Sequence, residues 1–135
     1  MADPYLLDTN VIVRFLAADS ADQLERAKRL IARAESGQVE LVVLPWVMAE
    51  VVYVLTGVYD VDRKAVADAL RTFAGGVGIT VEDHTIIMDA LQRFAKTKVD
   101  FANALLAAYA AARDTPPVSF DRDLDRFPDI RRLEP

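Results

Sequence analysis

The sequence predicts an α/β fold, in which a central parallel sheet of four to five strands is covered by helices on both faces. Short apolar runs alternate along the chain with longer segments whose apolar residues recur at helical spacing. This alternation is typical of parallel strands joined by helices. A chain of 135 residues has the size of one domain. No linker or internal repeat divides it, and we therefore expect a single domain over residues 1–135.

The helices are predicted from helical spacing together with residues that begin or end a helix. Ser20 and Gln23 form a capping box, Gly37 ends that helix, and Pro45 suits the first turn of the next. One helix is expected to begin near residue 11, and the others to occupy residues 20–37, 45–55, 62–73, 83–96 and 101–113.

Short apolar segments supply the strands. They are residues 5–7, 40–44, 79–81, 118–120 and 130–133, the last as an edge strand. Ligands of such sheets bind at the carboxyl ends of the strands. Asp8 and Asp121 each follow a predicted strand directly, so both are expected at that edge of the sheet.

The composition excludes several kinds of chemistry. The chain has no cysteine and a single histidine, His84, which excludes thiolate zinc sites, cysteine nucleophiles and mechanisms that use two histidines. A net charge of −5 argues against a broadly basic surface for nucleic acid. The apolar stretch 41–55 is shorter than the ~20 residues of a membrane span. We expect a cytoplasmic protein, without membrane association, whose chemistry rests on carboxylates.

Three carboxylates are the first candidates. Asp8 is expected near the core, where it needs a cation or hydrogen-bond donors, although it can equally cap the following helix. Glu50 is the only charged residue of the segment 41–55, and a buried carboxylate needs a metal ion or a partner such as Arg14. Asp121 repeats the arrangement of Asp8.

Further polar residues lie close to these acids in the predicted fold. Asp100 and Asn103 share the first turn of the alanine-rich helix, where Asp100 has simple capping as an alternative role. Asp123 can join the site, whereas Asp125 is expected on the surface. Carboxylates without cysteine or histidine favour Mg²⁺ or Mn²⁺ over Zn²⁺. Such an ion attracts phosphate oxygens and offsets the negative net charge.

Four short segments follow one another along the chain: Leu7-Asp8-Thr9-Asn10, Pro45 followed by Glu50, the stretch 100–106, and the stretch 119–123. In this order and spacing they resemble PIN-domain proteins, specifically the VapC toxins. The likeness runs from Tyr5 nearly to the C-terminus. It implies a three-layer α/β/α fold, a metal-dependent endoribonuclease, and inhibition by a cognate VapB-like antitoxin encoded beside it.

The resemblance assigns roles to single positions. Asp8, Glu50 and Asp121 match acids of the family, whereas Asn103 stands where the family commonly has aspartate. Asp100 can then supply the missing charge, and Asn103 a neutral oxygen ligand. We expect Asp8, Asp100, Asn103 and Asp121 to bind one or two Mg²⁺ ions, with Glu50 bound directly or through water. We expect such ions to support hydrolysis of RNA, with transfer RNA as one candidate substrate.

Weaker candidates are Asn10 and Ser119, which can hydrogen-bond metal-bound water or phosphate, and Arg14, which can contact substrate or an acidic partner. Ordinary capping or surface exposure is an alternative for each. The apolar residues 46–59 and the resemblance together indicate a homodimer. The second interpretation is a catalytically attenuated PIN domain that acts mainly by binding a partner, and Asn103 is its support. A DNA nuclease or a phosphatase-like hydrolase is the third.

Overall fold

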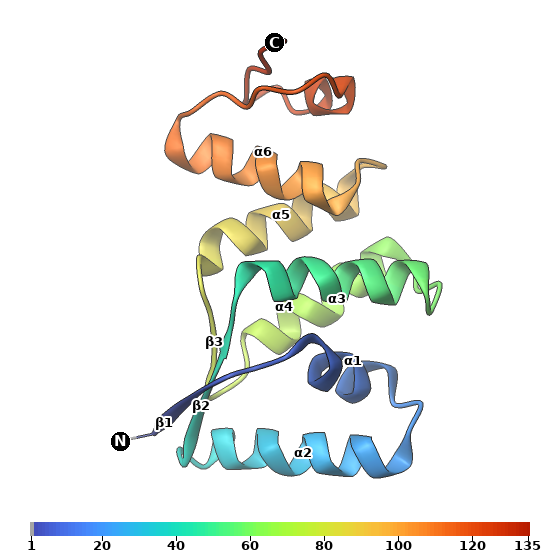
Figure 1. Cartoon of the computed structure of the whole chain (residues 1–135), viewed down its shortest axis with the longest axis vertical. Helices are drawn as coiled ribbons and strands as arrows, with labels where there is room; N and C mark the ends of the chain where they lie inside the picture. Colours follow the sequence, from blue (N-terminus) through green and yellow to red (C-terminus); the bar gives the residue numbers. More distant parts are fainter. Residues whose placement is uncertain (1) are drawn as a thin grey trace. The chain divides into compact units, whose positions relative to one another are not determined.

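The computed structural model describes residues 2–135, which form two compact units. The first unit extends to His84 and the second comprises Thr85–Pro135. Figure 1 shows the elements of each unit. No helix within residues 2–135 is long and apolar enough to cross a membrane.

A three-stranded parallel sheet organises the first unit. Its strands are β1 (Asp3–Leu6), β2 (Val39–Val43) and β3 (Ile79–Val81), with β2 in the centre. Tyr5 lies opposite Leu41, and Val43 lies opposite Val81. Val39, Leu41 and Val43 are at most 1% exposed, so the central strand supplies much of this unit's core.

Four helices pack in the same unit: α1 (Thr9–Ala17), α2 (Ala21–Glu35), α3 (Pro45–Gly57) and α4 (Arg63–Ala74). Two of these helices begin where the sequence predicted. Ser20 Oγ accepts a hydrogen bond from the Gln23 amide at the start of α2, and Pro45 is the first residue of α3. Helix α1 packs against both α2 and α3. The Leu7 amide donates to the Val42 carbonyl at 2.9 Å, so strand-like pairing continues up to Asp8.

The second unit is built from helices. Helix α5 (His84–Lys96) begins at the last residue of the first unit, and α6 (Phe101–Arg113) and a short 3₁₀ helix, η1 (Arg122–Arg126), follow. One cluster of buried hydrophobic residues in this unit comprises Val99, Ala107, Leu124 and Phe127, with Ile130 packed against it. Burial of Leu124 therefore fixes η1 against α6.

The predicted α/β class, with a parallel sheet flanked by helices, is confirmed. The prediction of a fourth and a fifth strand was wrong, because the described sheet has three strands. The segments 118–120 and 130–133 meet only at one parallel bridge, between Val118 and Leu133. Segment 118–120 directly follows Pro116 and Pro117, which have no backbone N–H group to donate to a neighbouring strand. Val118 is 61% exposed, so burial does not favour a longer strand there.

Candidate acidic site

Asp8 lies where β1 passes into α1, as the sequence predicted. It occupies the N-cap position with extended backbone, but its side chain makes no capping hydrogen bond. Its only described side-chain contact is a long one, in which Asn10 Nδ2 donates to Oδ2 at 3.5 Å. The capping alternative is therefore not realised by the side chain. An exposed carboxylate with most of its lone pairs open is available to a cation.

Thr9 is a neighbour of Asp8 that sequence reasoning missed. Its side chain is 2% exposed, and Oγ1 has no hydrogen-bond partner within residues 2–135. Buried hydroxyl groups usually find a partner. Thr9 belongs to the family-like segment Leu7-Asp8-Thr9-Asn10, but nothing in that segment predicted a buried hydroxyl without a partner.

Glu50 is exposed on α3, which corrects the expectation of a buried carboxylate that needs a partner. The buried side of α3 is formed by other positions, namely Val47, Met48, Val51, Val52 and Leu55. Glu50 is turned away from that side, because the helical repeat of 3.6 residues places it more than a third of a turn from the middle of the buried side. Its carboxylate faces solvent and is accessible to a ligand.

The sequence offered Arg14 as a partner for a buried Glu50, but Arg14 forms its hydrogen bonds elsewhere. Its Nη1 donates to the Tyr59 hydroxyl at 2.8 Å and to the Asp19 carboxylate at 3.3 Å. The Tyr59 hydroxyl in turn donates to Asp19 Oδ2 at 2.7 Å. This hydrogen bond, with the Arg14 charge, holds the pKa of Asp19 below its ordinary value, and the same bond raises the pKa of Tyr59. The three side chains join α1, the α1–α2 loop and the segment after α3.

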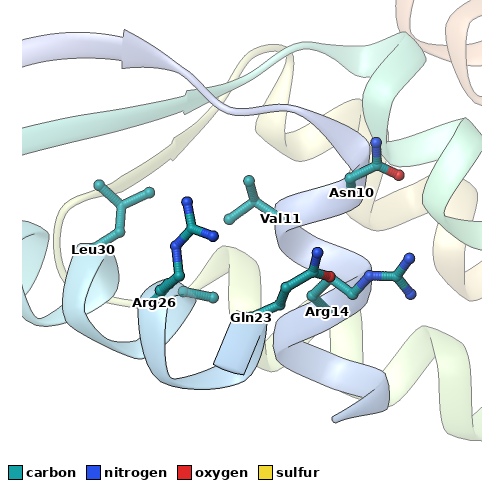
Figure 2. Close-up of a pocket in the computed structure, with 7 residues that line it drawn as sticks. Asn10, Val11, Arg14, Gln23, Arg26 and Leu30 are labelled. Carbon is teal, nitrogen blue, oxygen red and sulfur yellow. The ribbon is translucent and has the colours of Figure 1, made fainter. Parts of the chain in front are cut away.

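A groove of about 340 Å³ opens between α1 and α2. Figure 2 shows its lining, in which side chains of α1 and α2 face one another. The polar lining residues are Asn10, Arg14, Gln23 and Arg26, and the apolar ones are Val11, Ala27 and Leu30. Asn10 also contacts Asp8. The groove therefore begins beside a candidate acid and offers the guanidinium group of Arg26, whereas Arg14 directs its own toward Tyr59 and Asp19.

In the second unit, Asp100 caps α6. Its Oδ1 accepts a hydrogen bond from the Asn103 amide at 2.8 Å, so the capping role considered from the sequence is realised. Its second carboxylate oxygen stays available. Capping and ligand binding by Asp100 are therefore compatible.

Asn103 and Asp121 are in direct contact. Asn103 Nδ2 donates to Asp121 Oδ2 at 2.7 Å, and the Asp123 amide donates to Oδ1 at 2.9 Å. The Asp121 amide donates to Ser119 Oγ at 2.9 Å. Each oxygen of Asp121 thus accepts one hydrogen bond and retains a further lone pair. Ser119 and the Asp123 backbone orient the acid, while the Asp123 side chain has no described role in this network.

The candidate residues fall into two groups. Asp8, Asn10, Arg14 and Glu50 belong to the first unit, and Asp100, Asn103, Ser119, Asp121 and Asp123 belong to the second. Within residues 2–135 no three or more carboxylate, histidine or cysteine side chains come together as a cation site. Convergence of the two groups stays a prediction. Their donor set consists of carboxylate and amide oxygens, which suits Mg²⁺ or Mn²⁺.

Comparison with known proteins identifies the family. No curated protein matches the chain. Among solved structures, the chain is similar to one in the crystal structure of VapBC2 from Rickettsia felis bound to a DNA fragment from their promoter. The two chains are 16% identical, with a TM-score of 0.38, and the comparison covers 97% of this chain and 98% of that chain. Residues 5–130 match the PIN domain, a range that includes every candidate acid. The chain therefore belongs to the PIN-domain family.

Proposed function

We propose that this chain is a Mg²⁺- or Mn²⁺-dependent endoribonuclease, the VapC-type toxin of a toxin–antitoxin pair, with one PIN domain over residues 1–135. The observation that carries the proposal is how two carboxylates are held in a chain of the PIN-domain family. Asp8 follows β1 with a carboxylate that caps nothing, and Asp121 is held at the start of η1 by three hydrogen bonds.

The proposed metal ligands are Asp8, Asp100, Asn103 and Asp121, with Glu50 bound directly or through water. A bound divalent ion would neutralise phosphate charge and lower the pKa of a water molecule. The protein's own contribution is to fix ligand directions. Asn103 and the Asp123 amide restrain both oxygens of Asp121, so little rotamer entropy is lost when a ligand binds there. Asn10 can donate to a phosphate oxygen beside Asp8.

The proposal also includes partners. A VapB-like antitoxin is expected to inhibit the enzyme, and a homodimer is expected in solution. Exposed apolar side chains within the segment singled out for self-association support an interface, since Trp46, Tyr53 and Val58 are 58%, 76% and 74% exposed.

The test is RNA cleavage by the purified chain. Total RNA and transfer RNA are incubated with Mg²⁺, with Mn²⁺ or with EDTA, and Asp8→Ala is compared with Asp68→Ala. Asp68 is an exposed residue of α4 that pairs with Lys64 of the same helix, so its replacement should leave activity unchanged. We expect cleavage that needs metal and Asp8 but not Asp68. Cleavage by Asp8→Ala at the wild-type rate would rule out this site.

A second candidate function is supported by one contact. Asn103 presents its NH₂ group to Asp121, so the pair is satisfied without a cation. A catalytically attenuated domain that acts mainly by binding its partner would have this arrangement.

The Asn103→Asp variant separates the two functions. Two carboxylates at this distance repel unless a cation lies between them, so the variant should bind Mn²⁺ more tightly than the wild type. If only Asn103→Asp cleaves RNA, the natural chain is attenuated. Equal metal-dependent cleavage by both proteins would exclude attenuation.

A further inference from the structure

We propose that the groove between α1 and α2 is a nucleotide subsite, which holds one unpaired adenine nucleotide of the RNA substrate. Its base would lie on the apolar floor beside the Gln23 amide, and its phosphate would pair with Arg26. The inference rests on the proposed function, because the nucleotide belongs to the RNA that the acids would cleave. It adds a binding site and a base preference that the acids alone do not provide.

The position of the groove favours substrate as its occupant. Asn10 lines the groove and donates from Nδ2 to Asp8 Oδ2 at 3.5 Å. In Figure 2, Asn10 and Leu30 lie at opposite ends of the lining, so the groove leads away from Asp8 along α2. A phosphodiester held at Asp8 carries nucleotides on both sides, and one of them would lie over this groove.

The lining combines an apolar floor with a polar rim. Four lining residues share one side of α2, at the spacing of a helical repeat, namely Gln23, Arg26, Ala27 and Leu30. Ala27 is 5% exposed, and Val11 of α1 and Leu30 are half-buried, so these three form the floor. Gln23 and Arg26 are exposed, and Figure 2 shows both side chains directed from α2 toward α1.

The size of the groove suits a single nucleotide. Its volume of about 340 Å³ is near the lower end of the range for small-ligand sites, which is roughly 300–1,000 Å³. Bases in a duplex are stacked and have their pairing edges occupied, whereas an unpaired base can turn out of its strand and enter a pocket. The nucleotide is therefore expected to come from a single-stranded region.

Arg26 is the lining cation that is available to a phosphate. Arg14 also lines the groove, but its Nη1 donates to Tyr59 and Asp19. Arg26 lies 3.7 Å from Asp22, and the two side chains are 68% and 80% exposed. An ion pair with such exposure contributes little to stability. Arg26 can therefore exchange Asp22 for a phosphate, to which a guanidinium group donates two parallel hydrogen bonds.

Gln23 gives the subsite its base preference. Within residues 2–135 its side-chain amide makes no hydrogen bond, so its oxygen and its NH₂ group are both available. A glutamine amide pairs with adenine by accepting from N6 and donating to N7. Guanine has an oxygen at position 6, which would face the amide oxygen and be repelled. Adenine is therefore favoured over guanine.

A peptide segment of a partner protein is the competing occupant, because an acidic residue could also pair with Arg26. An amphipathic helix in a groove is held by apolar anchors that recur over two or more turns. The floor of this groove consists of three aliphatic side chains between polar ones, which suits the face of one base better. A bound substrate must also continue over the surface beside Asp8, whereas no such requirement applies to a peptide.

Nucleoside monophosphates test the subsite without cleavage. They contain no internucleotide bond, so the full-length wild-type protein is used, with EDTA to remove divalent ions. Isotope-labelled protein is titrated with AMP, GMP, CMP and UMP, and separately with inorganic phosphate, while backbone amide signals are followed by NMR. We expect AMP to shift the signals of residues 10–14 and 23–30, and to bind about tenfold more tightly than GMP.

Variants assign the two contacts. Gln23→Ala should abolish the preference for AMP over GMP, and Arg26→Gln should weaken binding of every nucleotide about tenfold. Lys28→Gln is the matched control, because it removes the same charge from α2 more than a third of a turn away from the groove side. Lys28 lies 3.8 Å from Glu25 on the helix surface, and its replacement should leave all affinities unchanged. Circular dichroism checks that each variant is folded.

Several results would overturn the proposal. If phosphate alone caused every shift that AMP causes, the groove would be an anion site without a base subsite. A preference for GMP that Arg26→Gln removes would assign base recognition to Arg26 instead of Gln23. Absence of shifts with every nucleotide would reject the subsite, and shifts of the same signals by a synthetic peptide of alternating leucine and glutamate would then identify a peptide as the occupant.

RNA cleavage separates failure of the subsite from failure of the proposed function. With Mg²⁺ or Mn²⁺, Gln23→Ala and Arg26→Gln should reduce cleavage at sites flanked by adenine, and Lys28→Gln should not. Metal-dependent cleavage that is insensitive to both substitutions would reject the subsite alone. AMP binding in the groove of a chain that cleaves no RNA with either metal would support the nucleotide site and reject the proposed function.

Discussion

Among single residues, Thr9 has the clearest expected effect on stability. Its Oγ1 is buried and has no hydrogen-bond partner in the described part of the chain, residues 2–135. A buried hydroxyl without a partner costs about 1–3 kcal/mol, depending on its surroundings. We predict that Thr9→Val, which keeps the shape, maintains the free energy of unfolding or raises it by up to about 1 kcal/mol in urea denaturation.

Thr9→Ala is the comparison, because it removes a methyl group as well and should destabilise the protein by about 1 kcal/mol. A loss of more than about 1 kcal/mol in Thr9→Val would mean that the hydroxyl makes a hydrogen bond in solution. An ordered water molecule would be the simplest partner.

The candidate acids could be chosen from the sequence, but their contacts could not. Asp8 and Asp121 were recognisable because each follows an apolar segment. Glu50 was chosen for its apolar neighbours, yet those neighbours turn to the other side of α3 and leave it exposed. The hydrogen bond from Asn103 to Asp121 joins residues 18 positions apart, and it depends on how η1 packs, which no local pattern encodes.

Between elements, Gly78 tests how closely the chain packs, because it immediately precedes β3 and lies against the C-terminal end of helix α2. Its φ is +79°, and a Cβ added there would lie 2.4 Å from the Ala34 carbonyl oxygen. Gly37 has a similar φ of +83° but has no atom within 4 Å of such a Cβ. Gly37→Ala therefore incurs the left-handed backbone strain alone, about 1 kcal/mol.

We predict that Gly78→Ala is destabilising by at least about 2 kcal/mol more than Gly37→Ala, because the end of α2 must move away from β3. Thermal unfolding of the two variants measures the difference. Similar melting temperatures for both would show that Gly78 and α2 are not packed as closely as described.

Helices were easier to predict than strands for a physical reason. Ser20, Asp62 and Asp100 each cap a helix with their own side chains, so the start signals are local. A strand forms only if a neighbouring strand supplies its hydrogen bonds. Segments 118–120 and 130–133 have apolar sequence but share a single bridge, and periodicity could not reveal that missing partner.

An ion pair that connects α5 to the C-terminal segment predicts acid sensitivity. Arg93 donates to Asp129 with both terminal nitrogens and to Asp89 with Nε at 3.0 Å. The hydrogen bonds from Arg93 hold the pKa of Asp129 below its ordinary value of 3.8. Because the folded-state pKa is depressed, the stabilisation is complete above about pH 4 and is lost as the pH falls through the lower, folded-state value.

We predict that Asp129→Asn lowers the free energy of unfolding at pH 7 by about 1 kcal/mol or less, since the Asp129 side chain is 51% exposed. The difference from the wild type should shrink below about pH 4, where the wild-type carboxylate becomes protonated. Urea denaturation across this pH range measures it. A difference that stays constant down to about pH 2 would show that charge on Asp129 is not the cause.

For the whole molecule, charge limits how RNA can be held. The chain has 16 lysine and arginine residues against 21 acids, and its net charge is −5. The groove between α1 and α2 offers two arginines, of which Arg14 is hydrogen-bonded to Asp19 and Arg26 lies 3.7 Å from Asp22. Few phosphates can therefore be neutralised directly.

We predict a shallow salt dependence of RNA binding by Asp8→Ala protein. Each neutralised phosphate of a single strand contributes about 0.7 to the slope of log K against log salt concentration, so two contacts give a slope of about −1.4. Affinity should then fall less than about tenfold between about 50 and about 200 mM salt, measured by fluorescence anisotropy. Arg26→Gln should reduce the slope by about 0.7 if that side chain contacts a phosphate. A loss of about a thousandfold would instead require many phosphate contacts, which so acidic a chain could supply only by concentrating its arginines and lysines on one face.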